Sequence, residues 1–160
     1  LAAGNMYTGN YLRTEGTNGV LNFGKQFTQR PTRLKGYFKY TSVEINKSND
    51  EMKYLIGQPD TCQIFIALGD WSEPVEIRTK PSDRKLFDKN DPHIIAYADM
   101  YSGKSVTEYT PFTLELEYRD TDRIPTYIVV VASASKYGDY FTGGDGSVLF
   151  LDDFTLEYDY

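Results

Sequence analysis

One pair of glutamates in this sequence has the spacing of a catalytic pair. Glu115 and Glu117 lie at i and i+2 in an alternating segment, and such residues share one face of a strand about 6.6 Å apart along the backbone. This separation is close to the carboxyl spacings that glycosidases use, and Asp120 follows nearby. Alternating glutamates are also typical of the solvated face of an antiparallel strand, where nothing raises the pKa of one carboxyl. The pair is therefore open to a catalytic and a structural interpretation.

Asp152 and Asp153 are adjacent near the end of the chain. Carboxylate oxygens suit Ca²⁺, which takes roughly six to eight oxygen ligands. Neighbouring residues of a strand point to opposite faces, so both side chains reach one ion only if the strand bulges. The pair predicts either a strand kink, with an aspartate accepting N–H groups from a neighbouring loop, or a single calcium ligand. We assign no metal to it.

Trp71, Cys62 and His93 each occur once. Trp71 lies in a turn-like segment, where an indole either stacks on a sugar ring or caps the end of the core, and the sequence leaves both open. A single cysteine excludes an internal disulfide and a multi-cysteine zinc site, and we predict that the Cys62 thiol is buried. A single histidine allows only one candidate for a His-based metal cluster or a Ser-His-Asp triad. We interpret His93 as the entry to a strand.

Strands must position these side chains, because the aromatic residues fall in short alternating segments and no segment has the apolar spacing of a helix. The expected strands are Val20–Phe23, Leu34–Val43, Cys62–Leu68, Val75–Arg78, Ile94–Met100, Phe112–Arg119, Tyr127–Ser133 and Ser147–Tyr158. Long loops at 41–61 and 80–92 connect some of them. So many strands without an internal repeat predict an all-β fold, a two-sheet antiparallel β-sandwich that is either a jelly roll or an immunoglobulin-like relative.

Size and charge limit the number of domains and the possible classes of partner. A chain of 160 residues predicts one domain over residues 1–160. Seventeen basic and 23 acidic residues give a formal charge of −6, which disfavours binding to nucleic acid. No apolar run reaches the roughly 18 residues of a membrane span, so we expect no membrane insertion. Because the chain starts at Leu1, we expect an N-terminal part of a longer protein to precede it.

Polar and aromatic side chains on the faces that we assign away from the core suit a sugar ligand. A sugar ring has an apolar C–H face, which stacks on aromatic rings, and a rim of hydroxyl groups, which hydrogen-bond to polar side chains. The predicted carbohydrate-binding residues are Tyr37, Lys39, Gln63, Trp71, Ser133 and Ser135. The sequence does not say whether their strands are neighbours, and we assign no catalytic residue.

Several segments, in order along the whole chain, resemble one family. They include Ala2-Ala3-Gly4-Asn5, Arg30-Pro31-Thr32, Asp60-Thr61-Cys62, Tyr109-Thr110-Pro111-Phe112, Gly143-Gly144 and Asp152-Asp153-Phe154. The set is similar to the "Putative carbohydrate metabolism domain" family, found in lipoproteins of glycan-degrading gut bacteria. The resemblance implies a jelly roll similar to carbohydrate-binding modules, located on the extracellular face of the outer membrane or in the periplasm. It also implies an upstream immunoglobulin-like domain in the full-length protein.

The resemblance further implies that the chain binds an oligo- or polysaccharide on the concave face of its sandwich. Two alternatives stay open. One is a carbohydrate-active enzyme that works through Glu115 and Glu117, and the other is a structural or adhesive module of a surface lipoprotein. No cofactor is expected. Modules of this fold often hold one structural calcium near the last strand, and Asp152 or Asp153 is the candidate ligand for such an ion.

Overall fold

The computed structural model describes residues 1–159, and its regular elements are strands and short 3₁₀ turns. The strands are β1 (Asn5–Tyr7), β2 (Gly9–Glu15), β3 (Asn18–Phe23), β4 (Lys25–Gln26), β5 (Arg33–Thr41), β6 (Cys62–Gly69), β7 (Val75–Arg78), β8 (Ile94–Ser102), β9 (Val106–Glu115), β10 (Glu117–Tyr118), β11 (Tyr127–Ser133) and β12 (Val148–Glu157). The turns are η1 (Lys53–Leu55), η2 (Pro81–Asp83) and η3 (Gly138–Tyr140). The predicted all-β class is confirmed. No helix in the described part of the chain is long and apolar enough to cross a membrane.

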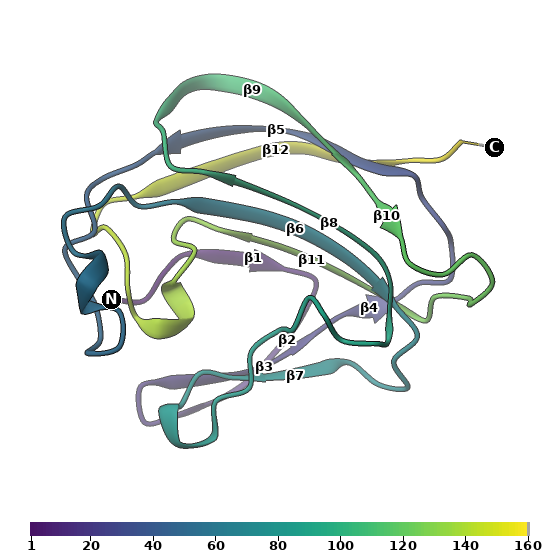
Figure 1. Cartoon of the computed structure of the whole chain (residues 1–160), viewed down its shortest axis with the longest axis horizontal. Coiled ribbons are helices and arrows are strands. Elements are labelled where there is room, and N and C mark those ends of the chain that lie inside the picture. Colours follow the sequence, from purple (N-terminus) through teal and green to yellow (C-terminus); the bar gives the residue numbers. More distant parts are fainter. Residues whose placement is uncertain (160) are drawn as a thin grey trace.

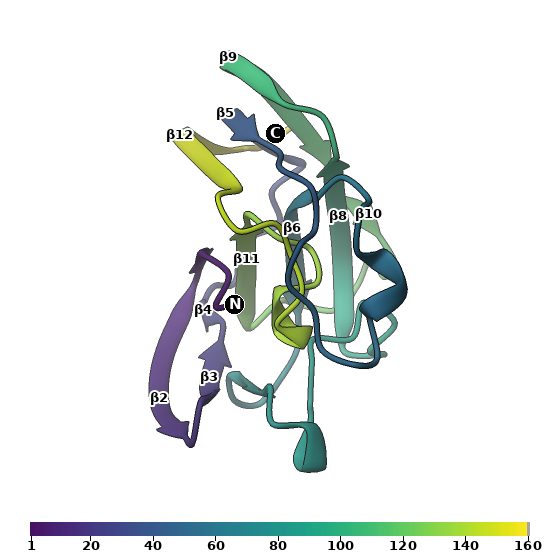
Figure 2. The same cartoon turned by 90° about the vertical axis from the view of Figure 1, so that its left-hand side faces the viewer.

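The strands form three antiparallel sheets that lie in layers (Figure 1). The central sheet has the order β1-β11-β6-β8-β10, and β4 also pairs with β11. One outer sheet has the order β12-β5-β9 and the other β2-β3-β7. In the views of Figures 1 and 2, β3 lies on the opposite side of β11 from β12. The predicted β-sandwich is therefore present, with a further small sheet on the second face of the central sheet, and the jelly-roll connectivity stays a prediction.

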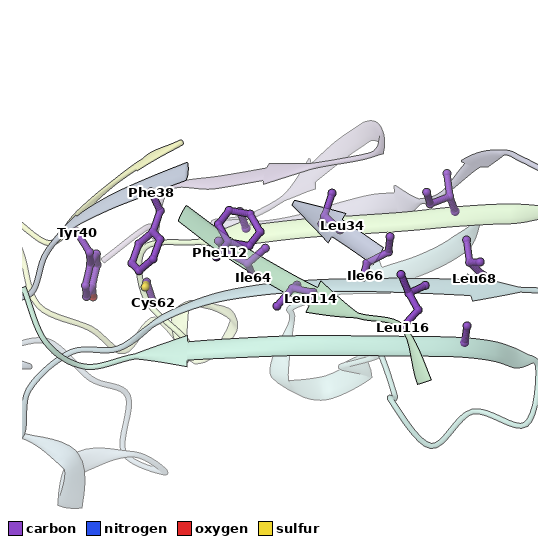
Figure 3. Packing of buried hydrophobic residues seen from close by; sticks show 13 residues of the cluster. Leu34, Phe38, Tyr40, Cys62, Ile64, Ile66, Leu68, Phe112, Leu114 and Leu116 are labelled. Carbon is purple, nitrogen blue, oxygen red and sulfur yellow. The ribbon is translucent and has the colours of Figure 1, made fainter. Parts of the chain in front are cut away.

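The main core lies between the central sheet and the β12-β5-β9 sheet (Figure 3). Alternation builds it, because the even-numbered residues of β6, from Ile64 to Leu68, and those of β9, Phe112 and Leu114, point into it. Cys62 is fully buried there, as predicted, and burial raises the pKa of its thiol to about 11. The thiol therefore packs as a small apolar group.

A second core lies between the other face of the central sheet and the small β2-β3-β7 sheet. Phe65 and Val131 of the central sheet are buried there with Phe23 and Ile77 of the small sheet. The small sheet has short strands, and the side chain of Tyr101 on β8 is 42% exposed on the same face of the central sheet. Part of this face is therefore open.

The last strand bulges at the aspartate pair, as the kink interpretation predicted, but the hydrogen bonds from a neighbouring loop that it assigned to this pair are accepted by another aspartate. Asp152 is opposite Tyr37 and Thr155 is opposite Lys35, so β12 has one extra residue here, and Asp153 has a φ of 52°. Both carboxylates are exposed, and no group of three or more potential metal-ligating residues occurs within residues 1–159. The pair thus marks a change in the register of the strand.

The aspartate that accepts hydrogen bonds from the loop before the last strand is Asp60, which is 1% exposed. Its Oδ2 atom accepts hydrogen bonds from the Ser135 hydroxyl (2.6 Å), the Ser147 hydroxyl (2.8 Å) and the Gly144 N–H (2.8 Å). Gly144 has no room for a side chain, because a Cβ atom would lie 2.8 Å from the Val43 carbonyl oxygen. One buried carboxylate therefore joins the ends of β6, β11 and the loop that leads into β12.

Candidate functional site

A groove of about 400 Å³ lies on the open part of the central sheet, on the face that carries the small sheet. Its floor comes from β6, β8 and β11, and its walls come from the loop at 86–90 and from the segment at 136–140, which contains η3. Figures 1 and 2 both show η3 beside the N-terminus of the chain. The groove is a hollow of the size that ligand sites commonly have.

The strand register places one polar residue from each of four neighbouring strands in a row across this floor. Ser133 of β11 is opposite Asn5 of β1 on one side and Gln63 of β6 on the other, and Gln63 is opposite Tyr101 of β8. The Gln63 side-chain amide donates a hydrogen bond to the Tyr101 hydroxyl oxygen at 3.3 Å. The row thus presents hydroxyl and amide groups side by side.

Asp99 lies beside this row and accepts hydrogen bonds from two tyrosines. The hydroxyls of Tyr97 and Tyr101 donate to its Oδ2 atom at 3.1 and 3.3 Å. Burial, together with the negative charge of Asp99, raises the pKa of Tyr97 and of Tyr101 above the usual tyrosine value. Both phenols therefore stay protonated at physiological pH, and their orientations are fixed by the same carboxylate.

Aromatic rings and a lysine form the wall on the side of η3. The Lys136 ammonium group lies 4.5 Å from the ring centroid of Tyr101 and 5.1 Å from that of Tyr137. Tyr140 is held from behind by Arg84, whose guanidinium lies 4.4 Å from the ring centroid and also bonds to Glu51. This wall presents aromatic faces next to a cation that has hydrogen-bond donors.

The opposite wall is apolar near the floor and polar at its rim. Phe87 stacks on Phe65 with ring centroids 5.1 Å apart, and Asp88, Lys89 and Asn90 follow it along the rim. The groove therefore combines flat apolar surfaces with charged and amide side chains, some of which donate hydrogen bonds and some of which accept them. This combination suits a ligand that is itself partly apolar and rich in hydroxyl groups.

Three of the predicted binding residues, Gln63, Ser133 and Ser135, lie along this groove. Gln63 is partly exposed, whereas the two serines are 9% and 4% exposed. The Ser133 hydroxyl donates to the Ser135 carbonyl oxygen at 2.9 Å, and the Ser135 hydroxyl donates to Asp60. The serines thus hold the floor and the wall together, and Gln63 is the most accessible of the three.

Trp71 lies away from the groove floor and is 7% exposed. Its indole N–H donates to the Asp91 carboxylate at 3.0 Å, and its ring meets Phe87 edge-on at 6.1 Å. The ring also fills the space above Gly69, where a Cβ atom would lie 2.4 Å from it. This geometry matches the alternative in which the indole caps the end of the core. His93 precedes β8, as predicted, and its Nδ1 atom lies 2.8 Å from Asp70.

Tyr37 and Lys39 lie on β5, on the outer face of the β12-β5-β9 sheet. The central sheet separates them from the groove. The structure therefore places Gln63, Ser133 and Ser135 at the groove, Tyr37 and Lys39 on another surface and Trp71 in the second core, and their assignment to a sugar stays a prediction.

Glu115 and Glu117 lie in different sheets. Glu115 ends β9, pairs with Arg33 in the β12-β5-β9 sheet, and accepts a hydrogen bond from the Arg33 side chain at 3.1 Å. Glu117 begins β10, which pairs with Tyr97 of the central sheet. The chain passes from one sheet to the other between the two carboxylates, and neither lines the groove. The single strand that the catalytic alternative assumed for both carboxylates is therefore interrupted between them.

None of the aromatic residues of the groove was predicted as a binding residue, and these include Tyr97, Tyr101, Tyr137 and Tyr140. A signal for two of them was present, because Tyr97, Asp99 and Tyr101 alternate with Ala98 and Met100. This pattern predicts a strand with one polar aromatic face. Tyr137 and Tyr140 lie in an irregular segment without such a pattern.

Comparison with known proteins gives a family and a fold. The model of the family described as "Putative carbohydrate metabolism domain" matches residues 1–157. No curated protein sequence matches the chain. A solved structure described as a "putative glycoside hydrolase" from Bacteroides thetaiotaomicron VPI-5482 is 23% identical with a TM-score of 0.73, and the match covers 99% of this chain and 48% of that one. A second structure with the same description, from Bacteroides vulgatus ATCC 8482, is 21% identical with a TM-score of 0.66, and the match covers 88% of this chain and 63% of that one.

These two structures share the fold of this chain, which spans about half and less than two thirds of their respective lengths. At such identities the likeness concerns the fold alone.

Proposed function

This chain belongs to the "Putative carbohydrate metabolism domain" family and has a carbohydrate-related role, and from this premise we propose that it binds an oligo- or polysaccharide in the groove on the central sheet. The resemblance of the sequence leads us to place this binding at the extracellular face of the outer membrane or in the periplasm.

The observation that carries the proposal is the row of Tyr101, Gln63 and Ser133 under the aromatic wall. The C–H face of a sugar ring stacks on an aromatic ring, because both are apolar and flat. The hydroxyls at the edge of the sugar then reach the Gln63 amide and the Lys136 ammonium group, which lies over the Tyr101 ring. The apolar face of the sugar thus contacts aromatic rings, and its hydroxyl groups hydrogen-bond to polar side chains.

Binding in this groove needs little rearrangement of the protein. Asp99 fixes the hydroxyls of Tyr97 and Tyr101, and Arg84 supports Tyr140 from behind. Side chains that are ordered before the ligand arrives lose less conformational entropy on binding. We propose noncovalent recognition by stacking and hydrogen bonding.

The test is an array of plant, host and microbial glycans probed with the protein and its Tyr101→Ala and Gln63→Ala variants. We expect a bound glycan for the protein and a loss of affinity of about tenfold for Tyr101→Ala, since the ring that positions Lys136 and the hydroxyl that orients Gln63 are both lost, which together costs on the order of 1 kcal/mol. Tyr54→Ala is the matched control, because Tyr54 is 70% exposed and does not line the groove.

A glycan signal that both groove variants retain in full would contradict binding in the groove. The same glycans should also be assayed for new reducing ends, because the alternative function is hydrolysis. If reducing ends form and neither Glu115→Gln nor Glu117→Gln slows their formation, that activity belongs to other residues of the protein.

A further inference from the structure

Three aromatic rings are exposed on the outer face of the β12-β5-β9 sheet. Tyr37 of β5, Tyr109 of β9 and Phe150 of β12 are 43%, 46% and 45% exposed. β5 is the middle strand, so the rings of the two flanking strands lie on either side of it. An exposed ring from each strand of one sheet face is an unusual use of apolar surface and indicates a contact that the rings make with something else.

Lys39 lies between two of these rings and fixes their positions. Its ammonium nitrogen is 4.6 Å from the ring centroid of Tyr109 and 4.8 Å from that of Phe150. Lys39 makes no salt bridge to any carboxylate among residues 1–159. Its N–H groups can therefore donate to an uncharged acceptor on the same surface.

A hollow of about 390 Å³ lies next to the rings, on the side of Tyr37. The bulge at Asp153 changes the register of β12 against β5 at this point. The hollow is lined by Tyr37, Pro111, Thr113, Asp153 and Thr155, together with Lys35, Gly36, Phe112 and Glu157. It thus offers an aromatic edge, hydroxyl groups and a carboxylate within one depression.

The charged side chains at the end of the hollow that contains Lys35 and Glu157, and those next to it, are paired with one another. Arg33 bonds to Glu115, Glu157 and Asp159, and Lys35 lies 3.2 Å from Glu157. This network holds three carboxylates and only two cations, and the exposed Asp153 also lines the hollow, so the face carries an excess of negative charge that disfavours an anionic ligand. A neutral ligand with apolar and hydroxyl surfaces fits such a face better than an anionic one.

We propose that this face, which we call the outer aromatic face and define by Tyr37, Lys39, Tyr109 and Phe150, is a second binding surface and takes a neutral polysaccharide chain. Successive sugar rings stack on the aromatic side chains and their hydroxyls hydrogen-bond to Lys39 and to the polar lining of the hollow. A protein partner fits this face less well, because protein interfaces of standard size bury about 800 Å² per partner and have an apolar centre. Here each ring has a polar or charged neighbour. This alternation of apolar and polar groups matches the surface of a sugar chain. The surface extends the proposed function but does not depend on the groove.

The test is electrophoresis in native gels that contain arabinoxylan, galactomannan, mixed-linkage β-glucan or pullulan. The proteins are the wild type, Tyr109→Ala/Phe150→Ala, Lys39→Met, the groove variant Tyr101→Ala and the control Tyr54→Ala, each checked by its melting temperature. We expect at least one polysaccharide to retard the wild type and the double variant to bind it about tenfold more weakly or worse, since two stacked rings are lost. Lys39→Met keeps an unbranched side chain between the rings and should weaken binding by a smaller factor.

The outcomes separate the two surfaces. If the double variant loses retardation while Tyr101→Ala keeps it, the outer aromatic face binds the polysaccharide even if the groove does not. If the Tyr109→Ala/Phe150→Ala variant is folded and every polysaccharide retards it as strongly as the wild type, the outer aromatic face is not a glycan site. The proposal also fails if none of the four polysaccharides retards the wild type. It fails as well if the double variant changes only the sedimentation coefficient, because the face is then a contact between protein copies.

Discussion

Asp60 shows how one buried side chain positions the wall of the groove. Its carboxylate accepts hydrogen bonds from Ser135, Gly144 and Ser147, and it also accepts one from the N–H of Thr61 at 2.8 Å. Ser135 belongs to the segment that continues into the wall with Lys136 and η3. A buried carboxylate is stable only when such donors surround it. The geometry of the wall therefore depends on this residue.

Replacing Asp60 with alanine should lower the free energy of unfolding by about 2–4 kcal/mol, because the buried Ser135 hydroxyl, the partly buried Ser147 hydroxyl and two backbone N–H groups lose their acceptor. Urea denaturation followed by the fluorescence of Trp71, the only tryptophan and a buried one, measures the change. Asp145→Ala, at an exposed position in the loop that Asp60 holds before β12, is the control and should stay within about 0.5 kcal/mol of the wild type. Equal urea midpoints for Asp60→Ala and Asp145→Ala would show that Asp60 does not hold these segments.

The alternation of single residues placed Gln63 and Ser133 on the strand face that turns away from the main core, but it did not predict that they lie side by side. Gln63 and Ser133 meet because β6 and β11 pair in one particular register. That register depends on contacts between residues far apart in the sequence, which local periodicity does not report. The same limit explains why Tyr37 and Lys39 were grouped with residues of a different sheet. Polar faces are visible in one strand, but a shared site is a property of several strands.

Among the elements, the strands whose apolar residues pack on a core were predicted and most of those without such residues were not. Val75–Arg78 and Tyr127–Ser133 have the bounds that the sequence predicted, whereas β1, β2 and β4 were missed. The residues of β2 are exposed or only partly buried, so no apolar period marks the strand. The turn after β2 could be detected from the sequence, because Gly16 lies in the connection to β3. Its φ there is 66°, a conformation that favours glycine. The segment predicted as Phe112–Arg119 is divided at Leu116, where the chain changes sheets.

The bulge in β12 permits a prediction for this strand. Asp153 has a left-handed backbone, which costs a β-branched residue about 1–2 kcal/mol and glycine almost nothing. We expect Asp153→Val to lower the free energy of unfolding by about that amount and Asp153→Gly to leave it equal or raise it by up to about 1 kcal/mol. Asp152→Val, at the neighbouring extended and exposed position, is the control and should have little effect.

The melting curves of these variants should also be recorded with Ca²⁺ and with EDTA. We expect the curves to coincide, since both aspartates are exposed and the described residues hold no third acidic ligand beside them. A rise in melting temperature with Ca²⁺ that Asp153→Gly or Asp152→Val removes would instead assign an ion to this bulge.

At the scale of the whole molecule, the layers place the two proposed binding surfaces on opposite sides. The groove lies on the face of the central sheet that carries the small sheet, and the outer aromatic face lies on the far side of the β12-β5-β9 sheet (Figures 1 and 2). The main core and both sheets separate them. A sugar chain bound to one surface therefore lies on the opposite side of the molecule from the other surface. One molecule can thus hold two separate chains.

We therefore expect the protein to cross-link a long polysaccharide that binds to both surfaces. Light scattering should rise as protein is added to such a polysaccharide and fall again when protein is in excess, because each chain then carries its own proteins. Tyr101→Ala and Tyr109→Ala/Phe150→Ala should each lower the rise while the remaining surface still binds, since a protein that binds weakly at one surface bridges fewer chains. The same polysaccharide cut to short oligosaccharides is the control and should give no rise with any variant. Scattering that rises as strongly in both variants as in the wild type would show that the bridge comes from association of the protein with itself, and the opposed arrangement of the two surfaces would then have no part in it.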